Sequence, residues 1–572
     1  MNWQRYIPIL AWLPTYDKQY LSSDMLAGIT VGVMVIPQGM AYGMLAGLPP
    51  IYGLYATLIP MLIYALMGTS RQLVVGPTAM VCLLIASGLS GLATAGTPEY
   101  IGWVLLLSLL VGCFQFAFGI FRLGFFVNFL SHPVLSGFLS AAAIIIICSQ
   151  LKNLTGAVYQ DTSHTLVGQL YEFFQHITTI DWSTLVLGLG GVFLILFLKW
   201  LKKSFPGPLL LLVLSILLLF LYHDTFPSID IVGEVPKGFP SFQVPALTIA
   251  AIQKILPTIF TISLIGILES IAIAKLVQNK HKDYELLPNQ ELRAIGMANI
   301  IGSFFQAFPA AGSVSRTAVN DEFGAKSGIA SLVAAVVVGL TLLFFTPLFY
   351  YLPKTILAAI IIVAVLRLID LKEAQFLWRS DRRDFWMLLV TFLATLFIGI
   401  EEGILLGIFI SLLMVLYKTT RPHITFLGRI PETEHYKNIE NAKELIKRKD
   451  ILIIRPDAPL YYANIEHFKE QLQAAMIKQQ AHLRLFILNA DCISELDSSA
   501  SHYLRELFTQ CRTDEISVYL TGVSDEVYTQ LKKAEVLPLL GGNFIFQSEQ
   551  NAVDYFDKQM LKRAIREGLT NN

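Results

Sequence analysis

Pro309-Ala-Ala-Gly-Ser-Val-Ser-Arg-Thr-Ala-Val-Asn320 interrupts a long apolar region with one full positive charge and several hydroxyl groups. Pro309 and Gly312 prevent a continuous helix, and the hydroxyl residues that follow suit the first turn of a new one. A charge at membrane depth costs at least about 2.5–3.5 kcal/mol, so it usually serves a function. A helix that begins inside a membrane presents free N–H groups, and beside Arg316 these groups favour an anion.

A second break of the same kind lies near the start of the chain. Leu73-Val-Val-Gly-Pro-Thr-Ala79 reads as a short extended segment with a proline at a helix start, before an apolar run over 80–92. Interrupted helices in corresponding positions of two halves indicate the midplane binding site of a transporter. We therefore expect two facing half-helix N-termini that bind an oxyanion through N–H groups, hydroxyls and one guanidinium. The candidate anion-binding residues are Pro77, Thr78, Ala79, Ser313, Ser315, Arg316 and Thr317.

The composition is that of a membrane protein without catalytic or metal chemistry. Hydrophobic residues make up 54% of the chain and charged residues 15%, with a mean hydropathy of +0.59, well above the balance of a soluble enzyme. The net charge of zero argues against a nucleic-acid-binding protein, which normally carries a basic excess. The five cysteines and ten histidines show no metal-ligand spacing, and no catalytic triad is recognisable. We expect no enzyme activity, no metal and no cofactor.

Apolar segments run from about Met25 to Tyr417 and predict about fourteen passes, shorter half-helices included. The expected centres lie near Val35, Ile59, Leu83, Leu109, Ile144, Leu194, Leu214, Leu264, Ile300, Ala318, Val337, Ile361, Leu393 and Phe409. Along this path the positive loop charges fall on one side, which places both termini in the cytoplasm. The expected domains are a cytoplasmic N-terminal segment (1–24), a transmembrane anion-transport domain (25–420), a linker (421–440) and a soluble α/β domain (441–565).

The soluble tail alternates strand and helix patterns, which predicts a small cytoplasmic α/β domain. Strands are expected over 451–455, 483–488, 517–520 and 544–546, and helices over 465–478, 499–511, 525–533 and 551–567.

Four stretches, together with this tail, closely resemble the sulfate permease (SulP) family of anion transporters with a C-terminal STAS domain. They are Ile36–Tyr42, Gly47–Tyr55, Val75–Ala79 and Gly312–Asn320. The resemblance covers nearly the whole chain. It implies a seven-plus-seven inverted repeat, shared with uracil-permease-type carriers, in which a core domain holds the substrate and a gate domain forms a dimer scaffold. Transport in such proteins proceeds by elevator-like movement of the core.

The resemblance also implies roles for two residues outside the breaks. Gln38 matches a glutamine that lies beside the anion in the family, although such a residue also suits an interhelical hydrogen bond. Glu269 is a lone carboxylate in an apolar helix, so it must be protonated or paired. In proton-coupled members the glutamate at this place accepts the proton. Sodium-coupled bicarbonate members have an Asp followed four residues later by Thr, but this chain has Ile273, which cannot ligate a hard cation. The alternative for Glu269 and Arg316 is a structural ion pair.

In the tail, the stretch Glu495–Ser501 follows a strand and opens a helix. Ser498 takes the place of the serine that is phosphorylated in bacterial anti-sigma-factor antagonists, which makes it a candidate regulatory phosphosite. The alternative is that Asp497 or Ser498 only caps the helix. The glycine that follows this motif in the antagonists is Ala500 here, which weakens a regulatory role. No glycine motif of the phosphate-binding kind supports a nucleotide site.

The sequence thus predicts a secondary active transporter of a small inorganic oxyanion in the inner or plasma membrane, with sulfate–proton symport by an elevator mechanism as the first interpretation. The expected partners are the anion, protons, the lipid bilayer, a second copy of the chain and a cytoplasmic partner of the STAS domain. Bicarbonate or C4-dicarboxylate transport, an anion channel and a sensor that signals through the STAS domain stay open as alternatives. A nucleobase permease is disfavoured, because those carriers use a second carboxylate where this chain has Arg316.

Overall fold

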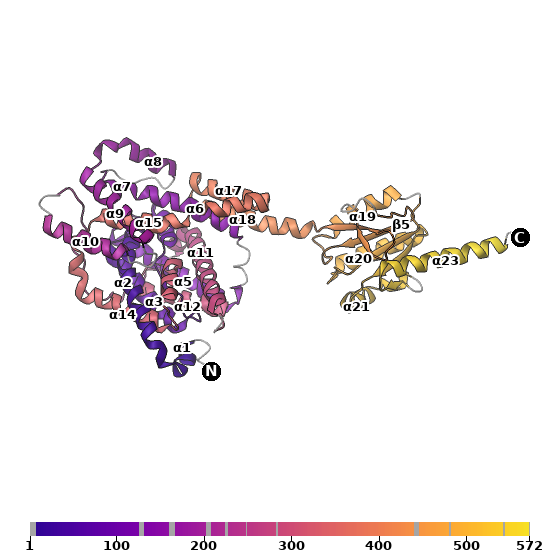
Figure 1. The fold of residues 1–572 in the computed structure, drawn as a ribbon, viewed down its shortest axis with the longest axis horizontal. Coiled ribbons are helices and arrows are strands. Elements are labelled where there is room, and N and C mark those ends of the chain that lie inside the picture. The colour runs from indigo at the N-terminus through magenta and orange to yellow at the C-terminus, as the bar shows by residue number, and fades with distance from the viewer. Residues whose placement is uncertain are drawn as a thin grey trace. The chain divides into compact units, whose positions relative to one another are not determined.

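The structure is a computed structural model that describes residues 7–124, 131–158, 166–201, 207–222, 227–247, 249–281, 284–439, 445–479, 482–540 and 544–570. The chain divides into two compact units, Met1–Leu412 and Leu413–Asn572. Figure 1 shows that the first is built of helices and that the second contains a sheet. The two units are described separately.

Each of the fourteen expected centres lies in a helix. The first seven helices are α2 (Leu21–Leu45), α3 (Pro50–Met67), α4 (Ala79–Leu89), α5 (Pro98–Ile120), α6 (His132–Ser149), α9 (Trp182–Leu201) and α10 (Gly207–Tyr222). The second seven are α11 (Ile249–His281), α12 (Pro288–Phe304), α13 (Val314–Glu322), α14 (Ile329–Leu340), α15 (Lys354–Val365), α17 (Arg382–Phe397) and α18 (Ile400–Thr420). Shorter helices accompany them: α1 (Ile9–Trp12), α7 (Leu151–Thr155), α8 (Leu166–Gln175) and α16 (Leu371–Ser380).

Length and hydropathy divide the fourteen helices into two groups. Among the described residues, 8 helical stretches are long and apolar enough to cross a membrane. They contain α2, α3, α5, α6, α9, α11, α14 and α18, whereas α4, α10, α12, α13, α15 and α17 fall outside that group. Helices α4 and α13 are short, as half-helices are expected to be, because each starts within the fold and not at its surface.

The helix contacts repeat between the two halves, as an inverted repeat requires. Helix α2 packs against α13 and α14, and its counterpart α11 packs against α4 and α5. In the same way α5 packs against α12 and α14 packs against α3. Outside this group of eight helices, α6 pairs with α17 and α9 pairs with α15. The first group forms one body around α4 and α13, and the second flanks it.

Two short strands join the halves at the centre of this body. Strand β1 (Val75–Gly76) pairs with β2 (Ala311–Gly312) in antiparallel register, Val75 opposite Gly312 and Gly76 opposite Ala311. Because α4 follows β1 and α13 follows β2, the antiparallel pair brings the two helix N-termini together and sends the helices away in opposite directions. The predicted half-helices are therefore present, and they are linked by backbone hydrogen bonds.

Helix α2 is continuous through Pro37. It continues from Leu21 to Leu45 with Pro37 inside it. A proline removes one backbone hydrogen bond, which neighbouring helices in a membrane protein can compensate. Close packing against α3 supports α2 here, since a Cβ placed on Gly53 would lie 1.8 Å from the carbonyl oxygen of Gly39.

The second unit is an α/β domain with a six-stranded sheet in the order β4-β3-β5-β6-β7-β8. The strands are β3 (Ile424–Arg429), β4 (Tyr436–Asn438), β5 (Ile451–Pro456), β6 (Leu485–Asn489), β7 (Ser517–Thr521) and β8 (Ile545–Phe546). β3 is antiparallel to both neighbours, and β5 to β8 are parallel. Helices α19 (Ile465–Gln479), α20 (Ser498–Thr513) and α21 (Asp525–Lys533) share one core cluster. The short α22 (Leu537–Leu540) joins that cluster, and α23 (Glu549–Thr570) supplies side chains to a second one.

The four strands and four helices predicted in the tail all exist, with ends that differ by a few residues. Strands β3 and β4 lie instead within residues 421–440, which we expected to form a linker. Residues 424–429 alternate buried and partly buried side chains, and residues 424–426 pair with β5. The sequence analysis missed β3 because it begins only four residues after the last membrane helix, within the stretch assigned to the linker.

Candidate anion-binding site

The N-terminus of α4 is built from three of the predicted residues. Pro77 follows β1, and Thr78 is the N-cap of α4, its hydroxyl oxygen accepting a hydrogen bond from the N–H of Val81 at 3.5 Å. Ala79 is the first helical residue, and all three are buried. The N–H groups of a first helical turn have no partner within the helix, so they are available to an anion in front of them.

The N-terminus of α13 is fixed to β1 by its own hydroxyl residues. Ser313 is the N-cap and donates its N–H to the carbonyl of Val74 at 3.1 Å, while the Thr317 hydroxyl accepts from the N–H of Val74 at 3.1 Å. The hydroxyls of Ser313 and Ser315 lie 3.5 Å apart. Thr317 therefore holds the two half-helices together, whereas Ser315, in the first turn, keeps its hydroxyl near the helix start.

Arg316 is a buried cation that forms no ion pair with any described residue. Its side chain is 1% exposed, and its Nε and Nη2 have no hydrogen-bond partner among the described residues. No described carboxylate forms an ion pair with it, although Glu269, Cys82 and Tyr42 are near enough to interact with its charge. Burying a cation without a hydrogen-bonded partner costs several kcal/mol. A bound anion would offset this cost, and the half-helix N-termini beside Arg316 favour the same charge.

Glu269 lies at the same place but is held by a different partner. Its Oε2 accepts a hydrogen bond from the Thr78 hydroxyl at 3.2 Å, which links α11 to the N-cap of α4. The ion pair between Glu269 and Arg316, the alternative reading of these two residues, is absent among the described contacts, so the two charges are neighbours that remain separately available. A carboxylate and a guanidinium at one site can couple the uptake of a proton to the binding of an anion.

Gln38 is the one predicted site residue that the structure does not connect to the others. It is 5% exposed on α2, and its Oε1 has no hydrogen-bond partner within the described residues. Helix α2 does pack against both α4 and α13. A buried amide oxygen without a partner costs about 1–3 kcal/mol, which is consistent with a polar ligand nearby.

The sequence analysis overlooked two residues that shape the strand β2. The Ser270 hydroxyl accepts from the N–H of Gly312 at 2.7 Å and donates to Gly266 at 2.6 Å. The Asn299 amide accepts from the N–H of Ala310 at 2.8 Å and donates to the carbonyl of Ala310 at 3.1 Å. Each is a polar residue in an otherwise apolar helix, and this pattern in the sequence could have drawn attention to Ser270 and Asn299.

Two fully buried carboxylates also escaped attention, and both bind backbone turns. Glu291 accepts from Thr69 and Ser70 after α3, and from the Tyr64 hydroxyl at 2.6 Å. Asp24 accepts from Lys326 and Ser327 before α14, and from the Tyr16 hydroxyl at 2.9 Å. Their acceptor positions are filled by several donors, so we assign them to the support of the fold and not to the anion.

Among the described residues, no group of three or more His, Cys, Asp or Glu side chains is placed so that it could hold a metal ion.

Comparison with known proteins identifies the family. The profile of the Sulfate permease family matches residues 21–391, and the profile of the STAS domain matches residues 442–552. The chain belongs to the sulfate permease family. It is 38% identical to "Sulfate transporter 4.1, chloroplastic" of Arabidopsis thaliana over 564 residues, which are 96% of this chain and 82% of that protein. It is 31% identical to "High affinity sulfate transporter 2" of Stylosanthes hamata, with 96% and 86% covered.

Solved structures of two transporters share the fold. The structure of murine Slc26a9, described as an anion transporter in the inward-facing state, superimposes with a TM-score of 0.88 at 26% identity, covering 96% of this chain and 94% of that one. The transmembrane domain of the cyanobacterial bicarbonate transporter BicA superimposes with a TM-score of 0.60 at 23% identity, covering 69% and 98%. The chain is accordingly a multi-pass anion transporter of the membrane with a C-terminal STAS domain.

In the STAS domain of this family member, Asp497 is the N-cap of α20. Its carboxylate accepts from the N–H of Ala500 at 2.8 Å and from the N–H of Tyr462 at 2.7 Å. Capping is therefore the observed role of Asp497. Ser498 is the first residue of α20 and is exposed, so its hydroxyl is accessible from solvent. Phosphorylation of Ser498 stays a prediction.

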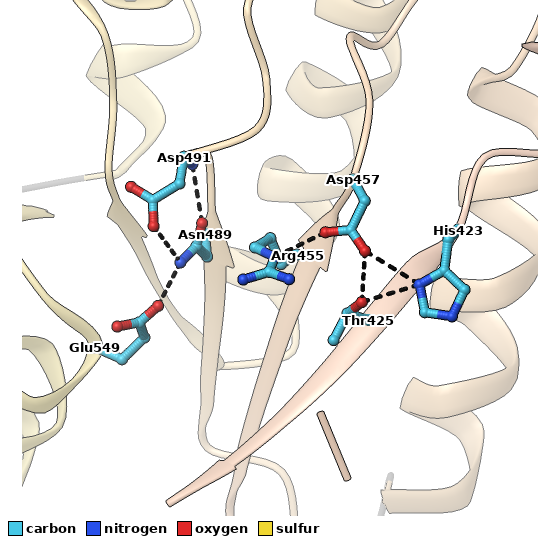
Figure 2. Close-up of polar contacts among 7 residues, drawn as sticks. All are labelled: His423, Thr425, Arg455, Asp457, Asn489, Asp491 and Glu549. Carbon is cyan, nitrogen blue, oxygen red and sulfur yellow. Dashed lines mark hydrogen bonds and ion pairs between the residues drawn. The ribbon is translucent and has the colours of Figure 1, made fainter. Parts of the chain in front are cut away.

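A polar network lies where strands β5 and β6 of the STAS domain end. Figure 2 shows Asp457 joined to His423 and Thr425 on one side and to Arg455 on the other. Beyond Arg455, Asn489 donates to Asp491 at 2.9 Å and to Glu549, the first residue of α23. The network connects β3 to β5, and β6 to α23. It therefore ties the antiparallel strand β3 to the parallel part of the sheet.

We expect Asp457→Asn to loosen β3 at neutral pH. Burial raises the pKa of Asp457, but hydrogen bonds from Thr425, Arg455 and His423 outweigh it and hold the pKa below its ordinary value. A carboxyl with a depressed pKa stabilises the fold above its unfolded pKa of about 3.9, and this stabilisation is lost as the pH falls through the folded pKa. Hydrogen exchange of β3 amides in the full-length protein should be several-fold faster in the variant at pH 7.

The difference between the variant and the wild type should shrink as the pH falls from about 3.9 through the lowered folded-state pKa, because below that pKa Asp457 is protonated in both the folded and the unfolded state. Asp525→Asn is a suitable control, since Asp525 is exposed at the start of α21. Equal β3 protection in wild type and Asp457→Asn at pH 7 would show that the network does not anchor this strand.

Proposed function

We propose that this protein is a secondary active transporter that carries sulfate together with protons across the inner or plasma membrane. The observation that carries the proposal is Arg316. Its buried guanidinium has no ion-pair partner among the described residues, and it lies at the start of one half-helix, across the β1–β2 pair from the other. The names of the relatives, which are called sulfate transporters, favour sulfate over the other small anions.

The chemistry of the site suits a tetrahedral oxyanion. A guanidinium offers parallel N–H donors that match two oxygens of one anion, and helix N-termini offer further N–H donors to the remaining oxygens. The hydroxyls of Ser313 and Ser315 supply neutral donors next to Arg316. Bicarbonate and C4-dicarboxylates present similar oxygens, so they remain the alternative substrates for the same site.

Coupling to protons follows from Glu269. The anion brings negative charge into a site that already holds this carboxylate, and protonation of Glu269 removes the repulsion between the two. Sodium is disfavoured, because Ile273 lies one helical turn from Glu269 and has no oxygen to offer a hard cation. Binding of the anion and binding of the proton then support one another.

We further propose elevator-type movement of the body formed by α2 to α5 and α11 to α14. The β1–β2 pair, the Thr78–Glu269 hydrogen bond and the Thr317–Val74 hydrogen bond tie its two halves together, so that they would move as one piece with the anion. The helices that flank this body would form the scaffold of a homodimer. Both termini would be cytoplasmic, and the STAS domain would regulate or assemble the transporter without forming the pathway.

Uptake into proteoliposomes tests the proposal. Purified full-length protein should accumulate labelled sulfate above its external concentration when the external medium is more acidic, and a protonophore should abolish the accumulation. Unlabelled sulfate should compete more strongly than bicarbonate or succinate. Downhill flux alone, insensitive to the proton gradient, would indicate a channel, and binding without flux would indicate a sensor; either result contradicts proton-driven transport.

A further inference from the structure

The space around Gly76 in β1 is filled by Arg316. A Cβ placed on Gly76 would lie 2.4 Å from Nη1 and 3.5 Å from Cζ of Arg316, so the guanidinium lies where a side chain at position 76 would begin. The backbone of Gly76 does not use the left-handed region that favours glycine. The reason for a glycine here is therefore space and not backbone conformation.

Hydrogen bonds among the described residues leave much of the Arg316 guanidinium unheld. Its Nε and Nη2 have no partner there, and an arginine side chain loses rotamer entropy when it is fixed in one place. Packing of the guanidinium against the bare backbone of β1 is therefore a contact that can position it. Because β1 leads directly into Pro77 and α4, this contact also places the charge next to the N-terminus of α4.

We propose that Gly76 is a positioning residue for anion binding, which sets where the Arg316 guanidinium lies between the two half-helices. The inference rests on the proposed function in one respect, that Arg316 contacts the transported anion. Gly312, the glycine of the partner strand β2, differs from Gly76: a Cβ on Gly312 would meet the Cα of Ser270 at 2.9 Å, and this backbone atom cannot move aside. Gly312 lets β2 pack closely against α11, whereas Gly76 makes room for the Arg316 side chain.

The Gly76→Ala variant should fold, because the group that must move is the end of a flexible side chain. Restoring an ordinary contact of 3.4–4 Å displaces Nη1 by roughly 1.0–1.6 Å. Since a misplacement of about 1 Å can cost two orders of magnitude in a site that depends on geometry, we expect sulfate affinity to fall by about tenfold or more. Gly312→Ala, the matched control, should lower the melting temperature instead.

A double-mutant cycle with Arg316→Lys separates positioning from a general effect on the fold. Lysine has a compact ammonium and no Nη1, so an added methyl at position 76 has no guanidinium to displace. Gly76→Ala should therefore weaken sulfate binding about tenfold or more in the Arg316 protein and by less than about twofold in the Arg316→Lys protein. Affinity is measured by calorimetry on the full-length protein, with the melting temperature of each variant recorded.

Additive effects in the cycle, or an unchanged affinity of Gly76→Ala, would overturn the proposal. A wild-type protein that does not bind sulfate would contradict the proposed function, and the cycle is then run with bicarbonate and succinate. A cryo-EM map of Gly76→Ala gives an outcome that is independent of the substrate. We expect a displaced Arg316 guanidinium with β1–β2 pairing retained, and an undisplaced guanidinium would refute the positioning role.

Discussion

Replacing Arg316 with alanine is expected to weaken sulfate binding by about ten- to a hundred-fold. Hydrogen bonds to a charged group contribute about 1.5–3 kcal/mol each, partly offset by the removal of water from the anion, and each 1.4 kcal/mol corresponds to a factor of ten. Arg316→Lys retains the charge but loses the planar pair of donors, so it should restore binding only in part. Calorimetry on the detergent-solubilised protein, with melting temperatures measured alongside, checks both variants.

The melting temperatures distinguish a binding role from a structural one. Since Arg316 is buried and has no described ion-pair partner, its removal takes away an uncompensated charge and should not destabilise the anion-free protein. If Arg316 instead braced the fold as the partner of Glu269, Arg316→Ala would misfold and the additional change Glu269→Gln would restore both stability and affinity. Lys275→Ala removes an exposed positive charge from α11 and serves as the control.

A stable Arg316→Ala protein with unchanged sulfate affinity would remove the guanidinium from the site. The N–H groups at the starts of α4 and α13 would then be the main attraction for the anion, and the positioning role of Gly76 would fall with it.

Much of the membrane fold could be predicted because the signals are local. Proline and glycine in an apolar run leave few alternatives to a helix that stops and restarts. Helices α4 and α13 start at the expected breaks, although α4 begins at Ala79, two residues after the proline that was expected to open it. Likewise, the tail shows strand and helix periods that depend on neighbouring residues only. The strand β3 was missed because its hydrogen bonds to β5 join residues about thirty positions apart, and nothing in its own six residues separates it from the end of α18.

The candidate site was predicted as a set of residues but not as a set of contacts. Sequence patterns indicated that Glu269 and Arg316 lie near one another, yet they could not show that Glu269 accepts from Thr78 and leaves Arg316 without an ion pair. Such choices depend on rotamers and on distances of a few tenths of an ångström. The role of Gly76 was hidden for the same reason, because a glycine that makes room for a side chain 240 residues later has no local signature.

The second large effect is expected for Glu269→Gln, which should abolish proton-driven accumulation of sulfate while sulfate binding is preserved. Glutamine has nearly the shape of the protonated acid and can still accept the hydrogen bond from the Thr78 hydroxyl, but it cannot gain or lose a proton. The site would then resemble its protonated form at every pH. Labelled sulfate should equilibrate across the membrane and exchange with internal sulfate, but an inward proton gradient should not concentrate it.

Proteoliposomes loaded with unlabelled sulfate separate the two activities, because exchange needs only the anion site whereas net accumulation against a gradient needs the coupling ion. Glu234→Gln, which changes an exposed carboxylate outside the membrane helices, should leave both activities unchanged. If Glu269→Gln still accumulated sulfate under an inward proton gradient, the proton would have to bind elsewhere, and the hydrogen bond between Thr78 and Glu269 would be a purely structural link between α4 and α11. If the variant lost binding as well, the carboxylate would be needed to hold the half-helix start in place, and coupling could not be assigned to it.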